Sequence, residues 1–377
     1  MFRSDERNRH FDRLVNTGGL RWLGQNTNHH PPHPAVRAAM LACIDGEEYH
    51  AYAPPLGFEA LRRAVLEDLG LPDMAAMITD GAVSGLHHVC NTFCTPGSRL
   101  ITTDPTWAWP MRFACARGAD VTQIPIYGDE HGWRLDPARL AAEVDAKTSV
   151  IYLVDPNNPL GTACTSAEIV AIADIARSAG AILIHDCTYR DFARSHHLAA
   201  QHYPEGTITV WSFSKWLGLA GLRVGALVAA PEVIERLADA PPNILGSNIL
   251  AQRAAIAGLA VKQEWFPDVL ATLRANQQAV KDACDGIEGL DLPVWPSDGN
   301  FVIIECRNAG VTPEALCAVL ARDNIMIRQG SYHTQAFGAR FIKVSLTVPP
   351  EWVAEFCAAL PGAVEKARGV NADVALF

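Results

Sequence analysis

The chain lacks a long apolar run, a Cys-x-x-Cys pair and an excess of basic residues. No apolar stretch is long enough to span a bilayer, so we expect no membrane-spanning helix. The 31 lysine and arginine residues are outnumbered by 41 aspartate and glutamate residues, and the formal charge is -10. This balance argues against nucleic acid or an anionic membrane as the partner. The ten cysteines are scattered, as is typical of free thiols in a cytoplasmic protein.

What remains is the composition of a globular protein with a large core. The chain has 377 residues, of which 49% are hydrophobic and 19% charged, so it is not a disordered protein. Its length corresponds to about two to three domains. Residues 1–10 mix Arg, Asp and Glu with no apolar region after them, so we expect neither a secretory signal nor an anchor. A small-molecule substrate and a cytoplasmic location fit these features best.

The most informative stretch is residues 211–225, which lies between two apolar runs that we predict to be strands. It offers two hydroxyls (Ser212 and Ser214), one lysine (Lys215) and one arginine (Arg223). A lysine held among small residues between strands can lose solvation, which lowers its pKa and makes it a carbonyl-trapping amine. Hydroxyls and a guanidinium are groups that hold a phosphate dianion. This combination suggests pyridoxal phosphate; the alternative is a structural loop with an exposed lysine.

The order Ser-x-Ser-Lys followed by Gly-Leu-Arg-x-Gly resembles the Schiff-base segment of fold-type I pyridoxal-phosphate enzymes, specifically the aspartate aminotransferase-like class I and II aminotransferases. The resemblance implies that Lys215 forms the Schiff base with the cofactor and later moves the substrate proton. It also implies that Ser212, Ser214 and Arg223 hold the cofactor phosphate.

A buried strand is predicted over residues 181–184, and Asp186 follows it. An aspartate at the end of a buried strand is costly unless a cation pairs with it. The resemblance implies that this cation is the protonated pyridine nitrogen, and that Tyr189 binds the phenolic oxygen of the cofactor. We therefore expect Lys215, Asp186 and Tyr189 to be the catalytic residues.

Residues 149–154 form an apolar run without alternation, as expected for a strand buried on both faces of a parallel sheet. The loop that follows resembles the family pattern Asn-Pro-x-Asn-Pro-Thr-Gly. Asp155 and Leu160 depart from this pattern, whereas Asn158 and Gly161 match it. The resemblance implies that Asn158 contacts the phenolic oxygen and lies beside the substrate.

Two further positions complete the predicted cofactor site. The turn formed by Gly81, Ala82 and Val83 opens a predicted helix and aims free backbone amides at an anion, although any strand-to-helix junction favours glycine. The family often has Ser or Thr at Ala82 and Val83, so the seat would use backbone amides only. Trp107 matches the family aromatic that stacks on the pyridine ring; the alternative is an ordinary core tryptophan.

Two segments near the N-terminus have weaker matches. Tyr52 lies where the family has a tyrosine that reaches the neighbouring subunit's cofactor phosphate, although a packed loop aromatic fits equally well. Asn28 lies in a segment similar to the family's Asn-Glu-Asn-Pro loop and is expected next to the substrate. His29, His30 and His33 surround it, but the intervening prolines prevent convergence on one ion, so we expect no metal site.

The main departure from the family lies in the predicted strand at residues 341–346. The family has an arginine at the position of Lys343, where it binds the substrate α-carboxylate. A lysine offers one point charge on a flexible stem instead of a rigid fork. We expect Lys343 to contact an anionic substrate group. Arg328 is an alternative, Arg340 a poorer one because it is three positions away on a period-two strand, and neutral drift at Lys343 is the last.

The alternation of predicted strands and helices from about residue 76 to 230 indicates an α/β fold with a mainly parallel sheet. We predict a large cofactor-binding domain at residues 45–270 and a smaller α/β domain formed by residues 1–44 and 271–377. The helical pattern at residues 249–287 predicts a break or kink near residues 265–267.

These patterns predict a pyridoxal-phosphate-dependent aminotransferase that moves an amino group between an amino acid, or an analogue of one, and a 2-oxo acid. A lyase or decarboxylase with the same cofactor is the alternative, because fold and cofactor do not settle the reaction. A non-catalytic binding protein with this fold is less favoured because Lys215 and Asp186 are intact. A role for Tyr52 needs a second subunit, so we expect a homodimer with shared active sites.

Overall fold

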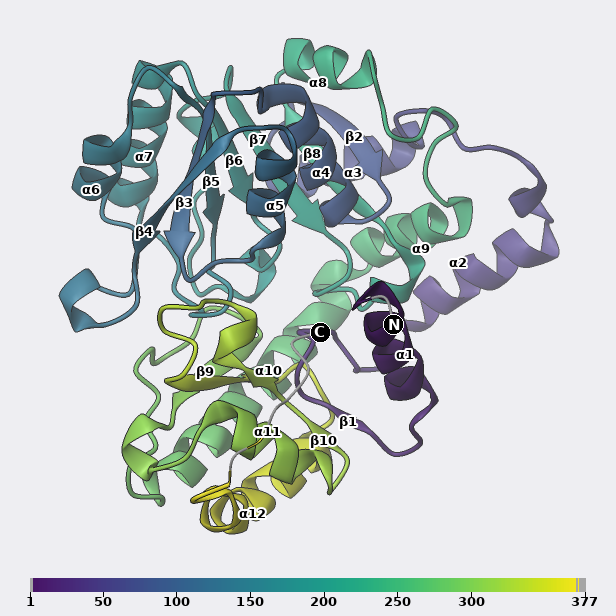
Figure 1. Cartoon of the computed structure of the whole chain (residues 1–377). Helices are drawn as coiled ribbons and strands as arrows, with labels where there is room; N and C mark the ends of the chain where they lie inside the picture. Colours follow the sequence, from purple (N-terminus) through teal and green to yellow (C-terminus); the bar gives the residue numbers. More distant parts are fainter. Residues whose placement is uncertain (1–2, 371, 373–377) are drawn as a thin grey trace.

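The computed structural model describes residues 3–370 and 372, and a seven-stranded sheet forms its larger part (Figure 1). The strand order is β2-β8-β7-β6-β5-β3-β4, and β8 runs against both of its neighbours while the other pairs are parallel. The strands are β2 (Ala75–Thr79), β3 (Arg99–Asp104), β4 (Asp120–Pro125), β5 (Thr148–Val154), β6 (Ile182–Asp186), β7 (Thr207–Ser212) and β8 (Gly225–Ala229).

Helices cover both faces of this sheet, which explains why its central strands are apolar throughout. In β5, Val150 and Tyr152 point to one core cluster, and Ile151 and Leu153 point to the other. The first cluster includes residues of α4 (Ala82–Phe93), α5 (Trp109–Ala116) and α8 (Pro231–Ala238). The second includes residues of α6 (Pro137–Glu143) and α7 (Ser166–Ala179).

The smaller part lies beyond the carboxyl ends of the parallel strands (Figure 1). Its antiparallel sheet has the order β11-β12-β9, and a two-stranded parallel sheet joins β1 to β10. Its strands are β1 (Arg21–Trp22), β9 (Phe301–Glu305), β10 (Ile325–Met326), β11 (Arg328–Gln329) and β12 (Phe341–Ser345). Its helices include α10 (Lys262–Asp285), α11 (Pro313–Ala321) and α12 (Pro350–Ala367).

The remaining helices lie near the N-terminus and at the junction of the two parts. They are α1 (Arg3–Asn16), α2 (Pro34–Asp45), α3 (Glu59–Leu69) and α9 (Ile249–Ala260), and α2 packs along α9. Short 3-10 helices also occur: η1 (Glu48–His50), η2 (Asp129–His131), η3 (Arg190–Phe192), η4 (Ala199–Gln201), η5 (Ala220–Leu222), η6 (Arg307–Ala309) and η7 (Gly330–Tyr332). No helix in the described part of the chain is long and apolar enough to cross a membrane.

The predicted α/β architecture with a mainly parallel sheet is confirmed, and the domain division at residues 45 and 270 stays a prediction. The break in the long helical region is misplaced by the sequence pattern. The chain leaves helical geometry at Val261 (φ -107°, ψ 7°), and Pro267 lies inside α10. Ion pairs of the buried Lys262 with Asp68 and Asp191 fix the chain next to this break.

Candidate active site

A cavity of about 140 Å³ lies at the carboxyl ends of β5, β6 and β7. This edge is where parallel α/β sheets bind their ligands. The cavity is lined by Ala82, Val83, Leu86, Trp107, Val154, Asn158, Asp186, Thr188, Tyr189, Ser212, Ser214 and Lys215. Most of the predicted cofactor residues therefore lie together.

Lys215 projects into this cavity from the loop after β7. Burial and the positive charge of Arg223 lower the pKa of Lys215 to about 8, although Asp186 opposes this shift. Its Nζ donates to the backbone carbonyl oxygen of Gln25 at 3.2 Å. Lys215 is thus deprotonated much more easily than an ordinary lysine, which favours its action as a carbonyl-trapping group.

Asp186 lies at the end of β6, and its two carboxylate oxygens are used unequally. Thr188 donates to Oδ1 through its hydroxyl at 2.6 Å and its amide at 3.1 Å, whereas Oδ2 accepts from the Tyr152 hydroxyl at 3.1 Å. Burial raises the pKa of Asp186, and these hydrogen bonds with the charge of Lys215 oppose the rise. Oδ2 retains accepting capacity for a cationic ligand in the cavity.

Tyr189 is held by a residue that the sequence patterns did not single out. The side-chain amide nitrogen of Asn26 donates to the Tyr189 hydroxyl at 2.9 Å, which leaves the hydroxyl proton free to donate to a ligand. Asn26 has a left-handed backbone (φ 56°), and its Oδ1 accepts from the Ser345 hydroxyl at 2.8 Å. Asn300 donates to the Asn26 carbonyl at 3.0 Å. Asn26 therefore connects β12 to Tyr189.

Asn28 makes two hydrogen bonds within the chain, and its place beside the substrate stays a prediction. Its Nδ2 donates to the Trp216 carbonyl at 2.8 Å, and its Oδ1 accepts from the His30 amide at 2.9 Å. Both ends of the amide are used to fix the N-terminal segment against the Lys215 loop. Asn26, two residues earlier, lies closer to the predicted chemistry.

The predicted phosphate seat is formed by close packing of two segments. Gly81 has φ +80°, and a Cβ atom there would lie 2.3 Å from Nη2 of Arg223. A Cβ atom at Gly225 would lie 2.5 Å from the Ala82 amide nitrogen. The guanidinium of Arg223 therefore lies against the start of α4, where free backbone amides favour an anion.

Lys343 is buried on β12 and reaches the cavity residue Asn158. Its Nζ lies 3.4 Å from Asn158 Oδ1 and 5.2 Å from the centre of the Phe301 ring. Burial and the charges of Arg328 and Lys215 hold the pKa of Lys343 well below its usual value. Among the described residues no carboxylate pairs with Lys343, so its charged form needs an anion from outside the protein.

The two arginines that could replace Lys343 have different surroundings. Arg328 is also buried and lies directly opposite Lys343 in the β11–β12 pairing, so both side chains share one sheet face. Arg340 pairs with Glu305 at 2.8 Å and lies over the Tyr127 ring. Arg340 is therefore engaged in a structural ion pair. Its spacing had predicted only that it is a poor substitute for Lys343.

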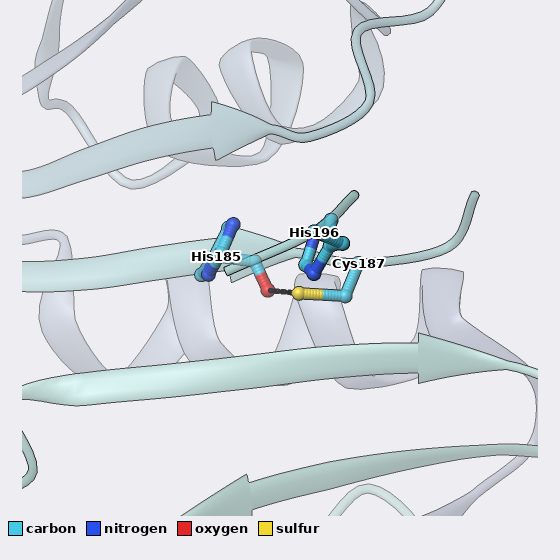
Figure 2. A group of neighbouring side chains, drawn as sticks. All are labelled: His185, Cys187 and His196. Carbon is cyan, nitrogen blue, oxygen red and sulfur yellow. Dashed lines mark hydrogen bonds between the residues drawn. The ribbon is translucent and has the colours of Figure 1, made fainter. Parts of the chain in front are cut away.

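The side chains of His185, Cys187 and the half-buried His196 lie close together (Figure 2). Asp155 Oδ2 is 3.3 Å from Nε2 of His185 and 3.2 Å from Nε2 of His196. Ala199 donates its amide to His185 Nδ1, so the proton of that ring lies on Nε2 and leaves no lone pair there for a metal.

Nε2 of His196 faces two acceptors, Asp155 Oδ2 and the Asp155 backbone carbonyl oxygen at 3.1 Å, so this nitrogen also carries a proton. Burial raises the pKa of Asp155, but hydrogen bonds from His185 and His196 outweigh it and hold the pKa below its usual range. The departure of Asp155 from the family's asparagine thus provides the carboxylate of a hydrogen-bonded unit. Of the earlier histidines, His33 caps α2 and His29 contacts Thr27 at 2.8 Å, whereas Nε2 of His30 has no partner among the described residues.

Comparison with known proteins agrees with this geometry. The family model for aminotransferase class I and II matches residues 20–360. Histidinol-phosphate aminotransferase of Bdellovibrio bacteriovorus is 30% identical over 310 residues, which cover 78% of this chain and 79% of that protein. The corresponding protein of Geotalea daltonii is 30% identical over 280 residues, covering 74% and 76%. The chain belongs to the class I and II aminotransferases.

Solved structures agree with this assignment at the level of the fold. An aminotransferase from Mycobacterium tuberculosis superposes with a TM-score of 0.85 at 23% identity, covering 96% of each chain. Aspartate aminotransferase of Thermus thermophilus with maleate gives a TM-score of 0.80 at 20% identity, covering 94% of this chain and 95% of that one. The predicted fold-type I architecture is confirmed.

This aminotransferase uses pyridoxal phosphate, and its cavity fits that cofactor. The buried Asp186 carboxylate suits a protonated ring nitrogen, Arg223 and the α4 amides suit a phosphate, and Lys215 suits an aldehyde. The sequence patterns missed four residues that form hydrogen bonds with the predicted catalytic residues: Gln25, Asn26, Tyr152 and Thr188.

Proposed function

We propose that this aminotransferase acts on an amino substrate whose anionic group is bound by Lys343 and Arg328. The observation that carries this proposal is the burial of two basic side chains, on facing strands, without a carboxylate partner among the described residues. Buried charges are costly unless they are paired. Lys343 also lies within 3.4 Å of Asn158, so an anion bound to it would be adjacent to the cofactor cavity.

Each cavity residue has a proposed role toward the cofactor and the transferred proton. When bound, the cofactor supplies the electron sink for the substrate carbanion. Lys215 attaches the cofactor and then, as a free amine beside the Gln25 carbonyl, moves the proton. Asp186 keeps the ring nitrogen protonated, and Tyr189, Asn158 and Trp107 orient the ring. The phosphate is held by the α4 turn (Gly81, Ala82 and Val83), Ser212, Ser214 and Arg223.

The relatives suggest which anionic group to test first. The similar proteins of Bdellovibrio bacteriovorus and Geotalea daltonii are named for histidinol phosphate, an amine that bears a phosphate rather than an α-carboxylate. A lysine binds as a point charge, so Lys343 does not require the planar fork geometry of a carboxylate. A phosphate-bearing amine and an ordinary α-amino acid are therefore both candidate donors, with a 2-oxo acid as acceptor.

We also propose a homodimer in which Tyr52 reaches the partner's phosphate seat. Tyr52 is 79% exposed, and the neighbouring Leu41, Ile44, Tyr49 and Ile244 are exposed as well. Buried Cys43, Ala53 and Ile249 pack these segments together. Asn243 donates to Asp80 at 3.2 Å, so this apolar face adjoins the turn at Gly81. Such an exposed apolar patch is typical of a subunit interface. Light scattering of the purified protein measures whether two chains associate.

The reaction is tested by mixing stoichiometric protein and donor and following the cofactor absorbance. Matched pairs isolate the anionic group: histidinol phosphate against histidinol, and an α-amino acid against its carboxamide. We expect conversion to the pyridoxamine form, with the anionic member of at least one pair strongly preferred. Equal rates within both pairs would contradict the anion site. Release of ammonia or carbon dioxide with the aldehyde form regenerated would instead favour the lyase alternative.

A further inference from the structure

His333 is a buried histidine whose imidazole has no hydrogen-bond partner. It follows η7 in the loop between β11 and β12 and is 4% exposed. Neither Nδ1 nor Nε2 contacts a donor or acceptor among the described residues. Buried polar groups are nearly always hydrogen-bonded, and leaving one unpaired is costly. An orphaned imidazole in a folded protein therefore indicates a partner from outside the chain.

Other buried histidines of the chain show the usual arrangement. His88 on α4 is equally buried, and its Nε2 lies 2.7 Å from the Leu237 carbonyl. His185 has both ring nitrogens engaged, by Ala199 and by Asp155. Of these three buried histidines, His333 is the one with no partner at either ring nitrogen among the described residues.

The surroundings of His333 connect it to the proposed anion site. Burial and the positive charges of Lys343 and Arg328 hold the pKa of His333 well below its usual value, so the ring is neutral. Its neighbour Tyr332 contacts it edge-on at 5.1 Å, and the Arg328 guanidinium lies 4.6 Å from the Tyr332 ring centre. A neutral imidazole adds a hydrogen-bond donor beside two basic groups without adding a third buried charge.

We propose that His333 is a specificity-determining residue that donates a hydrogen bond to the substrate oxyanion bound by Lys343 and Arg328. This inference rests on the proposed function of Lys343 as an anion-binding residue. Lys343 supplies the charge, whereas His333 supplies a directional N–H. Together they select a substrate whose oxyanion presents oxygens to both groups at once.

The test uses the cofactor-loaded enzyme and the variant His333→Phe, which keeps a ring but removes both nitrogens. Without added anion, its melting temperature should equal or exceed that of the wild type, because two unsatisfied polar atoms are lost. The stabilisation caused by inorganic phosphate or by maleate should fall. KM for the preferred anionic donor should rise by about tenfold, as expected for one lost hydrogen bond to a charged group, while kcat changes little. In His333→Asn, which retains a hydrogen-bond donor, KM should lie between the values of the wild type and of His333→Phe.

His88→Phe is the matched control, because it removes a satisfied buried imidazole that does not line the cavity. It should lower the melting temperature and leave KM unchanged. An unchanged KM and an unchanged anion response in His333→Phe would overturn the inference, as would an equal rise in KM for an uncharged donor. If Lys343→Met raises KM and His333→Phe does not, only the proposed role of His333 is contradicted. If neither variant changes KM, the proposed anion site is contradicted as well.

Discussion

Two buried clusters in this enzyme each contain an arginine and a lysine, yet their surroundings differ. In the paired cluster, Lys262 lies 2.8 Å from Asp68 and 2.6 Å from Asp191, and Arg190 lies 2.7 Å from Asp68. In the open cluster, Arg328 and Lys343 face each other across β11 and β12, and no carboxylate among the described residues pairs with them.

The difference separates a structural use of buried charge from a ligand-binding one. Lys262 and Lys343 are 7% and 3% exposed, so burial does not distinguish them. The two lysines differ in their partners. The paired cluster also contacts the segment that carries Lys215: Asp191 accepts from Trp211 Nε1 at 2.9 Å, and Lys262 lies 4.7 Å from the Trp216 ring centre. A buried basic group without a carboxylate partner in the protein is suited to bind an anionic ligand.

The paired cluster should be the more sensitive to loss of one charge. Lys262→Met leaves Arg190 as the remaining cation of Asp68 and Asp191, so we expect the free energy of unfolding to fall by about 3 kcal/mol, the lower end for loss of one partner of a buried pair. Urea unfolding of the cofactor-loaded protein measures this change. A loss below about 1 kcal/mol would mean that the pairing contributes little, and would remove the contrast with the open cluster.

Asp186 is the complementary case, a buried carboxylate that awaits a cation from the cofactor. Asp186→Ala should still bind pyridoxal phosphate through Arg223 and the α4 amides, but its turnover should fall on the order of 10²-fold or more, as for loss of a preorganised electrostatic contact. Cofactor content and kcat are measured on the same preparation. Turnover close to wild type in a fully loaded variant would exclude the proposed pairing with the ring nitrogen.

Lys343→Met tests the open cluster directly. The Michaelis constant for the preferred anionic donor should rise on the order of tenfold or more, since one charge-assisted hydrogen bond of about 1.5 to 3 kcal/mol is lost. Unfolding stability should stay the same or increase, the opposite of Lys262→Met, because an unpaired buried amine is replaced by an apolar chain. Loss of stability without a change in the Michaelis constant would assign Lys343 to the fold.

The smallest effect is expected at Asn26, which connects the two parts through Tyr189 and Ser345. Asn26→Gly removes the amide and tolerates the left-handed backbone, so the loss of about 1 kcal/mol should reduce kcat about fivefold. The double variant with Tyr189→Phe should lose less activation free energy, calculated from kcat, than the sum of the losses in the two single variants. Strict additivity would show that Asn26 does not act through Tyr189. Asn28→Ala, which removes the contacts with Trp216 and His30 but none with Tyr189, serves as the control.

The sequence predicted those features that local patterns encode. Uninterrupted apolar runs such as residues 149–154 identify strands covered on both faces, and Lys215, Asp186 and Asn158 follow such strands. β4 was not predicted, because its mixed burial gives no clear run. The contact of Asn26 with Tyr189 joins residues 163 positions apart, and the orphaned state of His333 depends on everything packed around it. Neither property is present in a local pattern.

The central claim, that Lys215 carries the cofactor, is tested most directly by borohydride reduction of the loaded enzyme followed by peptide mass mapping. The test discriminates well because two buried lysines lie within reach of Asn158 and Asp186: Lys215, with a pKa of about 8, and Lys343. We predict a single cofactor adduct on the peptide that contains Lys215. An adduct on Lys343, or on any other lysine, would contradict the assignment of both the catalytic amine and the anion site.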